Sequence, residues 1–288
     1  MFAFQKKGKN SMRIISLNLR YAHSLDMNNQ GVREPRIVSF ISEYSPDFLG
    51  VQECEPFWRK RLLETLVPLG YLPAHDETFD ANGKYGFKNF IWYNGERNEL
   101  IESGKIWLSE TPDVPSKGFG SRFYISAGYA VLKNKASGET FVYFNTHLDV
   151  YDVETRKREV AVLISKIKSF EDKGYKVFVT GDFNDVPESD IYKLMADNFL
   201  DARISAKTTT NLGTFNGYRT EGQTIDIASY ECIDYCFYTK DVGIDIERFD
   251  VVDNWNGGYM SDHNAVIIDT YSSETTSMRE YVCGFLKE

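Results

Sequence analysis

Two short polar segments near opposite ends of the chain constrain its fold most. Residues 180–185 (TGDFND) follow the apolar run 176–179, and residues 261–264 (SDHN) precede the apolar run 265–268. Short runs rich in β-branched and aromatic residues are typical of buried strands. Reactive side chains at the ends of such strands, facing a shared cleft, are how an α/β scaffold forms a site for chemistry. We therefore expect an α/β fold with its functional site at the strand ends.

The same arrangement recurs in four other parts of the chain. Apolar runs over residues 14–17, 48–51, 141–144 and 233–238 each have a polar side chain at or near one end. These side chains are Asn18, Glu53, His147 and Asp234. A carboxylate such as Glu53 has little reason to end an apolar strand unless it is paired or binds a cation. The pattern therefore indicates one site that draws on several strands.

Helical stripes separate the strand-like runs. Apolar residues recur at helical spacing after Pro35, after Trp58 and after Asp152. We expect Pro35 to lie at a helix start and Asp152 to be an N-cap. Residues 135–139 predict a hairpin turn between two strands. Many strands and few helices favour two packed sheets with the helices outside.

In their order along the chain, these motifs resemble those of the endonuclease/exonuclease/phosphatase superfamily, whose members have the deoxyribonuclease I-like fold. The resemblance extends from about residue 13 to residue 268. It implies a four-layer α/β/β/α sandwich, with the metal and the substrate at one end of the sheets. Residues 103–112 and 145–149 look like one bacterial, deadenylase-like branch.

We expect the metal site at Asn18, Glu53 and Asp262. Phosphoester hydrolysis requires neutralised phosphate charge, an activated water and a stabilised leaving oxygen. A hard divalent cation, Mg²⁺ or Mn²⁺, neutralises the charge and prefers carboxylate and amide oxygens. The alternatives are a helix-start acid before Pro56 for Glu53 and a turn amide for Asn18.

Water activation suits a histidine that a carboxylate orients. His263 and Asp234 are our candidates, because family members pair these positions. Asp226 is a rival to Asp234, but the strand-like run after Asp234 matches the family pattern better.

The resemblance gives roles to three further catalytic candidates. They are Asp182, which aligns the water or binds a second cation; Asn184, which holds a phosphate oxygen; and His147, which donates a hydrogen bond to a non-bridging or leaving oxygen.

The chain departs from the family pattern at one place. Family members commonly have a glutamate shortly before an Asn, and it supports the first histidine. Here Asn89 fits, but Phe87 and Lys88 stand where the acid is expected. His147 then lacks its usual partner, unless Asp149 replaces the acid.

We expect substrate contacts from Asn89, Asp149 and Arg156. Arg156 lies on the predicted helix after His147, and a structural role and a phosphate contact are equally open for it. An aromatic rim that stacks a base or sugar is a further hypothesis; its members are Phe215, Tyr218, Trp255 and Tyr259.

Composition limits the partners. A net charge of −9 over 288 residues argues against a broad basic face for long duplex nucleic acid. No stretch approaches the length of a membrane span, so no membrane partner is expected. Four cysteines are too few for a disulfide scaffold, which favours a cytoplasmic protein.

We divide the chain into a flexible leader (1–11), one domain (12–271) and a C-terminal extension (272–288). Apolar residues recur at helical spacing in the extension, so we expect a helix there.

The predicted function is that of a metal-dependent phosphoesterase. It would hydrolyse a phosphodiester or phosphomonoester, in a small phosphorylated metabolite or a nucleic-acid end, by in-line attack of an activated water. The alternative, which the missing glutamate motivates, is a catalytically impaired binding module on the same fold. No residue pattern indicates the oligomeric state.

Overall fold

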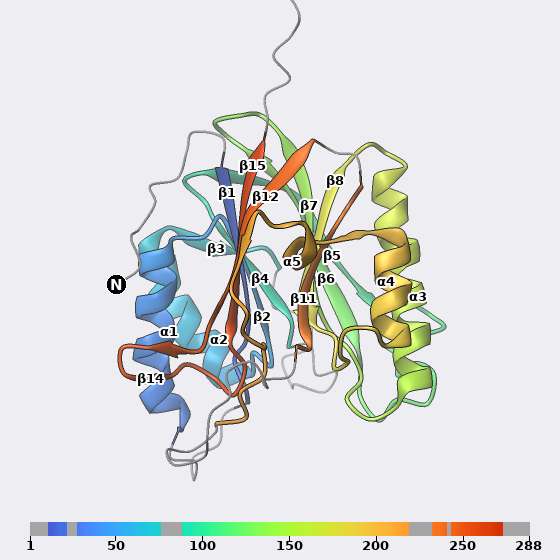
Figure 1. Cartoon of the computed structure of the whole chain (residues 1–288), viewed down its shortest axis with the longest axis horizontal. Coiled ribbons are helices and arrows are strands. Elements are labelled where there is room, and N and C mark those ends of the chain that lie inside the picture. Colours follow the sequence, from blue (N-terminus) through green and yellow to red (C-terminus); the bar gives the residue numbers. More distant parts are fainter. Residues whose placement is uncertain (1–10, 22–27, 76–87, 219–231, 241–242, 273–288) are drawn as a thin grey trace, which may run out of the picture.

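Two β-sheets face each other in the middle of the molecule, and helices cover their outer faces (Figure 1). The computed structural model describes residues 11–21, 28–75, 88–218, 232–240 and 243–272. Helices α1 (Gln30–Tyr44) and α2 (Pro56–Leu66) cover one sheet, and α3 (Val153–Glu171) and α4 (Asp190–Asn198) cover the other. The predicted four-layer α/β/β/α sandwich is confirmed.

The first sheet has seven strands in the order β10-β12-β15-β1-β2-β4-β3. Their bounds are β1 (Ser11–Asn18), β2 (Phe48–Gln52), β3 (Tyr71–Pro73), β4 (Phe90–Asn94), β10 (Thr208–Thr209), β12 (Ile244–Val252) and β15 (Ala265–Ser272). At its centre β1 pairs parallel with β2 and antiparallel with β15. Thus β1 and β2 end, and β15 begins, at the same end of the sheet.

The second sheet has six strands in the order β5-β6-β7-β8-β11-β9. Their bounds are β5 (Asn98–Trp107), β6 (Ser126–Asn134), β7 (Thr140–His147), β8 (Lys176–Asp182), β9 (Leu200–Asp201) and β11 (Asp234–Tyr238). Strands β7 and β8 are parallel, and β11 runs antiparallel to β8. Shorter elements are η1 (Val67–Leu69), α5 (Ala202–Ser205) and the pair β13 (Asn254–Trp255) and β14 (Gly258–Tyr259).

The core lies in three layers, which explains the nearly continuous apolar runs. Ile14 of β1 and Phe178 of β8 belong to the cluster between the sheets, whereas Ile15 packs beneath α1 and α2 and Val179 beneath α3 and α4. Side chains alternate between the faces of a strand, so a strand that is covered on both faces is apolar at every position.

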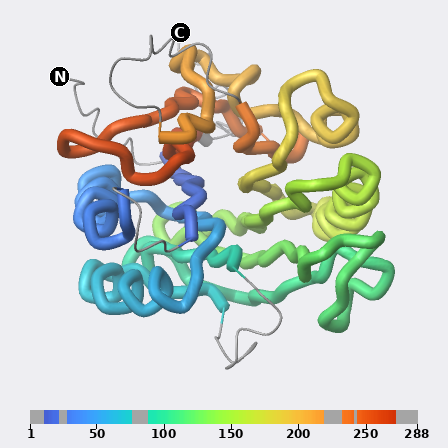
Figure 2. Tube along the Cα trace, turned by 90° about the horizontal axis from the view of Figure 1, so that it is seen from below, coloured from blue at the N-terminus to red at the C-terminus, as the bar shows by residue number. Residues whose placement is uncertain are grey.

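The central strands β1, β2, β7 and β8 all end at the lower end of the molecule in Figure 1. Figure 2 looks onto this end. The strands of one sheet pack directly on those of the other. Residues that follow these strands are therefore brought together at one end of the sandwich.

Two local predictions had different outcomes. Asp152 caps α3, and its side chain accepts a hydrogen bond from the Thr155 N–H at 2.7 Å, as predicted. The prediction that Pro35 lies at a helix start was wrong: α1 begins at Gln30, where Asn29 is the cap, and contains Pro35. Pro35 is the sixth residue of α1 and has no N–H, so the helix lacks the hydrogen bond to the Gly31 carbonyl there.

Two parts of the domain prediction lie outside the described residues. These are most of the predicted leader, residues 1–10, and nearly all of the extension, residues 273–288. Within the described ranges, no helix is both long and apolar enough to cross a membrane.

Candidate active site

The register of the second sheet places three predicted residues side by side. Asp182 of β8 is paired with His147 of β7 on one side and with Asp234 of β11 on the other. The His147 Nε2 lies 3.4 Å from Asp182 Oδ2. Both aspartates are buried, whereas the His147 side chain is 22% exposed. The row of three thus has its histidine facing solvent and its carboxylates inside.

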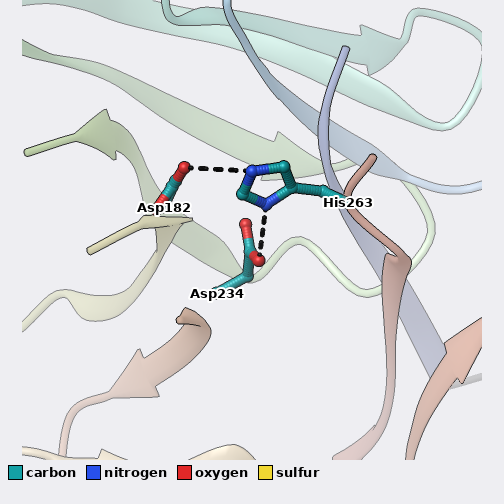
Figure 3. Close-up of side chains that lie close together, drawn as sticks. All are labelled: Asp182, Asp234 and His263. Carbon is teal, nitrogen blue, oxygen red and sulfur yellow. Dashed lines mark hydrogen bonds and ion pairs between the residues drawn. The ribbon is translucent and has the colours of Figure 1, made fainter. Parts of the chain in front are cut away.

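His263, just before β15, completes this group from the other sheet. Its Nδ1 lies 2.9 Å from Asp234 Oδ2, and its Nε2 lies 3.6 Å from Asp182 Oδ2 (Figure 3). The predicted pairing of His263 with Asp234 is therefore present in the structure. The rival partner, Asp226, lies outside the described residues.

The imidazole of His263 is held as a cation by its two neighbours. Burial alone would lower its pKa, but the charges of Asp234 and Asp182 outweigh burial and raise the pKa of His263 to about 10. Burial also raises the pKa of Asp234, and the charge of His263 counteracts this effect. We place the shared proton on the imidazole, because two carboxylates face it.

Asn18 joins the two sheets at the site. Its buried Nδ2 donates to Asp182 Oδ2 at 3.0 Å and lies 3.4 Å from Glu53 Oε1. The other oxygen of Glu53 accepts a hydrogen bond from the Tyr21 N–H at 2.8 Å. Two of the predicted metal ligands, Asn18 and Glu53, are therefore neighbours, and Asp182 lies beside them.

The third predicted metal ligand, Asp262, is bound to an arginine. Its Oδ2 accepts a hydrogen bond from Arg20 Nη1 at 2.8 Å, and its Oδ1 accepts one from Ser261 Oγ at 3.1 Å. The sequence reasoning missed Arg20. The available signal was its position two residues after Asn18, at the end of the same strand.

Three residues of the site have left-handed backbone conformations. They are Arg20, Glu53 and Asn184, with φ angles of 51°, 53° and 50°. Residues other than glycine adopt this region uncommonly, and such conformations cluster at functional sites. Each of these residues directly follows a central strand or lies two positions beyond it.

The motif around Asp182 has two supporting features. A Cβ on Gly181 would overlap the carbonyl oxygen of Thr146, so β7 and β8 approach as closely as they do only with glycine here. Asn184 donates from Nδ2 to the Leu148 carbonyl at 2.9 Å, and its N–H donates to Asp182 Oδ1 at 2.9 Å. Asn184 therefore fixes the chain directly after His147.

The three expected substrate contacts are buried in the scaffold. Arg156 donates to Asp185 Oδ2 and to the Asp149 carbonyl, and Asn89 donates to the Ser126 carbonyl. The exposed fractions of Arg156, Asp149 and Asn89 are 6%, 2% and 5%. Of the two open roles of Arg156, the structural one fits these contacts, because its guanidinium already has protein partners.

Asp149 does not take the place of the missing family glutamate in the contacts that the structure shows. Its Oδ2 accepts from Ser121 Oγ at 2.7 Å, and its Oδ1 accepts from the N–H groups of Tyr151 and Asp152 at 2.8 and 3.0 Å. Both oxygens thus hold the loop after β7. Lys88, which stands where the acid was expected, pairs with Glu55.

A loop around residues 214–216 supports the His263–Asp234 pair and was also missed. Thr214 Oγ1 accepts hydrogen bonds from the backbone N–H groups of Ile233 and Asp234, both at 2.9 Å. Asn216 Nδ2 donates to Asn264 Oδ1 at 2.7 Å. These contacts tie the segment before β11 to the segment before β15.

The predicted aromatic rim is only partly present. Phe215 lies edge-on to the His263 ring, with centroids 5.0 Å apart, and Tyr218 contacts Tyr259. Trp255 instead packs on Phe40 and Tyr44 of α1, so it belongs to the core.

The donor set fits a hard divalent cation. Four carboxylates, those of Glu53, Asp182, Asp234 and Asp262, gather here, and among the described residues the basic side chains that contact them are His263, His147 and Arg20. A cation among the oxygens would offset this excess of negative charge. Ligand atoms of Asp182, Asp234 and His263 also lie within 4.8 Å of one another. Both ring nitrogens of His263 already face carboxylates, those of Asp234 and Asp182, so oxygens on the Glu53 side suit a metal better.

Comparisons with known proteins agree with this geometry. A protein of Bacteroides vulgatus described as an endonuclease/exonuclease/phosphatase is 27% identical, with a TM-score of 0.81 over 91% of this chain and 99% of that chain. The mannosyl-6-phosphatase of Bacteroides thetaiotaomicron is 25% identical, with a TM-score of 0.78 over 90% and 99%. An uncharacterised protein of Acanthamoeba polyphaga mimivirus is 27% identical over an alignment of 212 residues that covers 69% of this chain and 76% of that protein.

The family model of the Endonuclease/Exonuclease/phosphatase family matches residues 15–263. This range includes the candidate metal ligands and catalytic residues, from Asn18 to His263. The chain therefore belongs to the Endonuclease/Exonuclease/phosphatase family.

Proposed function

We propose that this protein is a phosphoesterase that depends on a divalent metal and hydrolyses its substrate by in-line attack of an activated water. The observation that carries the proposal is the position of His263, buried between Asp234 and Asp182. One carboxylate orients the histidine at Nδ1, and a second acid lies near Nε2. Such a histidine can accept a proton at Nε2 from a water that lies between this nitrogen and the second acid. Phosphoester hydrolysis is also the chemistry of the family.

Each residue has a role in this proposal. Glu53, Asn18 and Asp262 would hold Mg²⁺ or Mn²⁺, which supplies charge neutralisation for the phosphate. His263 accepts the proton of the water, and Asp234 stabilises the imidazolium that forms. Asp182 aligns the water. His147, the partly exposed member of the row, donates a hydrogen bond to a phosphate oxygen, and Asn184 holds the chain behind it.

His263 must be neutral when it accepts the proton. Its pKa is about 10 when only the carboxylates surround it. A cation held by Glu53, Asn18 and Asp262 would oppose the charge of the nearby carboxylates, and so it would lower the pKa of His263 toward neutrality. The proposal thus makes the divalent cation necessary for the base as well as for the phosphate.

A small phosphorylated metabolite is the substrate class that we favour. The net charge of −9 leaves little capacity to neutralise a long row of phosphates. One relative at 25% identity is described as a mannosyl-6-phosphatase, whose substrate carries a phosphomonoester. A salt titration of binding to a 30-mer duplex, in Ca²⁺, tests this point. Tight binding with a steep salt dependence would favour a nucleic-acid substrate instead.

The alternative of a catalytically impaired binding module rests on the missing glutamate near Lys88. The buried pair of His263 and Asp234 opposes it, because a binding module has no need for a buried charged dyad. The deciding measurement is turnover of p-nitrophenyl phosphate and bis-p-nitrophenyl phosphate with increasing Mg²⁺ or Mn²⁺. Glu53→Ala is the negative control.

Saturable, metal-dependent turnover that Glu53→Ala abolishes would support the enzyme. Metal binding without turnover of any phosphoester in a panel would support the binding module. The cytoplasmic location, the deadenylase-like branch and the domain boundaries stay predictions.

A further inference from the structure

Arg20 is fixed at the edge of the proposed catalytic group by its backbone. Its N–H donates to Asn18 Oδ1 at 2.9 Å, and its carbonyl accepts a hydrogen bond from Trp58 Nε1 at 2.8 Å. Its φ angle of 51° lies in the left-handed region. Because the backbone of Arg20 is already ordered, binding a ligand costs less conformational entropy than it would in a mobile segment.

The guanidinium of Arg20 is held in place but still reaches solvent. Nη1 donates to Asp262 at 2.8 Å, and the guanidinium carbon lies 4.8 Å from the centroid of the Tyr218 ring. The side chains of Arg20 and Asp262 are 24% and 15% exposed. Arginine stacked on an aromatic ring keeps its fork of donors in one plane, which is the geometry that binds phosphate oxygens.

Two other arginines in the described part of the chain, Arg33 and Arg156, are used differently. The guanidinium of Arg33 is buried and donates to the backbone carbonyls of Leu19 and Asn28. Arg156 is buried against Asp185. The charge of Arg20 is instead placed beside Asp262, which directly precedes His263, and two hydrogen bonds through Asn18 connect Arg20 to Asp182.

We infer that Arg20 binds the non-bridging oxygens of the substrate phosphate and makes the site prefer a terminal phosphate over a phosphodiester. The inference rests on the proposed function. A phosphomonoester carries up to two charges and three terminal oxygens, whereas a diester carries one charge and two such oxygens. A second cationic group beside the metal ligands therefore favours the monoester, because the additional charge and oxygen both find a partner.

The test compares Arg20→Gln and Arg20→Lys with the wild type and with Arg61→Gln. Arg61 lies on α2, where it pairs with Glu34 and Glu64, and provides the same chemical change away from the site. The first measurement is titration calorimetry of inorganic phosphate in Ca²⁺. The second is the ratio of kcat/KM for p-nitrophenyl phosphate to kcat/KM for bis-p-nitrophenyl phosphate. Thermal unfolding confirms that each variant is folded.

We expect Arg20→Gln to weaken phosphate binding about tenfold to a hundredfold, the range for a charge-assisted hydrogen bond. The monoester-to-diester ratio should fall with it. Arg20→Lys should retain part of the affinity, since it keeps the charge and loses the planar fork. Arg61→Gln should match the wild type in both measurements.

Two results would overturn the inference. One is unchanged phosphate affinity in folded Arg20→Gln. The other is an equal loss of activity on both esters, since that would mean that Arg20 acts only by holding Asp262. If the wild type hydrolyses neither ester but binds phosphate through Arg20, the proposed function fails while the binding role of Arg20 stands.

Discussion

Removal of the Asp234 charge is the sharpest test of the proposed base. Asp234 is 3% exposed, its Oδ2 lies 2.9 Å from His263 Nδ1, and Thr214 accepts a hydrogen bond from its backbone N–H. Burial lowers the pKa of His263, and the charge of Asp234 is the largest influence that raises it. Asp234→Asn keeps the shape but removes the charge that stabilises the imidazolium and selects its tautomer.

We expect Asp234→Asn to lower kcat/KM about 10³- to 10⁴-fold, by analogy with other hydrolases in which an aspartate orients a catalytic histidine. The assay is hydrolysis of p-nitrophenyl phosphate at saturating Mg²⁺, with His263→Ala and the double variant alongside. Asp190→Asn, at an exposed position of α4, is the matched control and should be unaffected. Thermal unfolding checks that each variant is folded.

The double variant should be about as slow as His263→Ala alone, because groups that act as a unit are not additive when removed. Two independent losses of 10³ to 10⁴ would instead multiply to about 10⁶ to 10⁸. Such a multiplied loss would refute the pairing of His263 with Asp234 as the catalytic unit. Asp182, 3.6 Å from the other ring nitrogen, would then be the partner to test.

Three further predictions follow from the same structure. Glu53→Ala removes a hard ligand and should lower turnover by about two to four orders of magnitude; unchanged wild-type turnover in EDTA would contradict the metal requirement. Burial raises the pKa of Glu159 to about 8. Its contribution to the free energy of unfolding is therefore fully present below pH 4.5 and is lost as the pH rises through 8. Glu159→Gln should therefore increase the free energy of urea unfolding at pH 9, by on the order of 5 kcal/mol, and change it little at pH 5. Burial lowers the pKa of His75 to about 4, so its contribution to the free energy of unfolding is fully present above pH 6.5 and is lost as the pH falls toward 4. This loss is on the order of 3 kcal/mol in the wild type, and urea unfolding of His75→Gln should show a smaller decrease over the same pH range.

The strands of the fold could be predicted because both of their faces are buried. Apolar side chains fill both faces of β1, β2, β7 and β8, so each strand stands out as an apolar run. The polar residues that end those runs are the ones that the structure brings together. Sequence order alone did not show the register, however, and it is the register that pairs Asp182 with both His147 and Asp234.

The residues expected to contact the substrate show that the tertiary partners of a charged side chain cannot be predicted from a single sequence. Arg156 is charged and lies one helical turn after the loop that follows β7, which suits a phosphate contact as well as a buried role. Its direction depends on Asp185, which comes from a different loop, and on the Asp149 carbonyl. Partners of this kind are fixed only by tertiary structure, and no local spacing indicates them.

The left-handed residues at the strand ends connect the fold to the chemistry. The left-handed backbone conformation of a residue other than glycine costs on the order of 1 to 3 kcal/mol of conformational free energy. Arg20, Glu53 and Asn184 therefore need compensating contacts. Each has them: Arg20 bonds to Asn18 and Asp262, Glu53 accepts from the Tyr21 N–H, and Asn184 bonds to Asp182 and the Leu148 carbonyl. Most of these partners are themselves members of the site. The strain and the hydrogen bonds therefore support each other, and a substitution that removes one partner should loosen a strand end as well as remove a functional group.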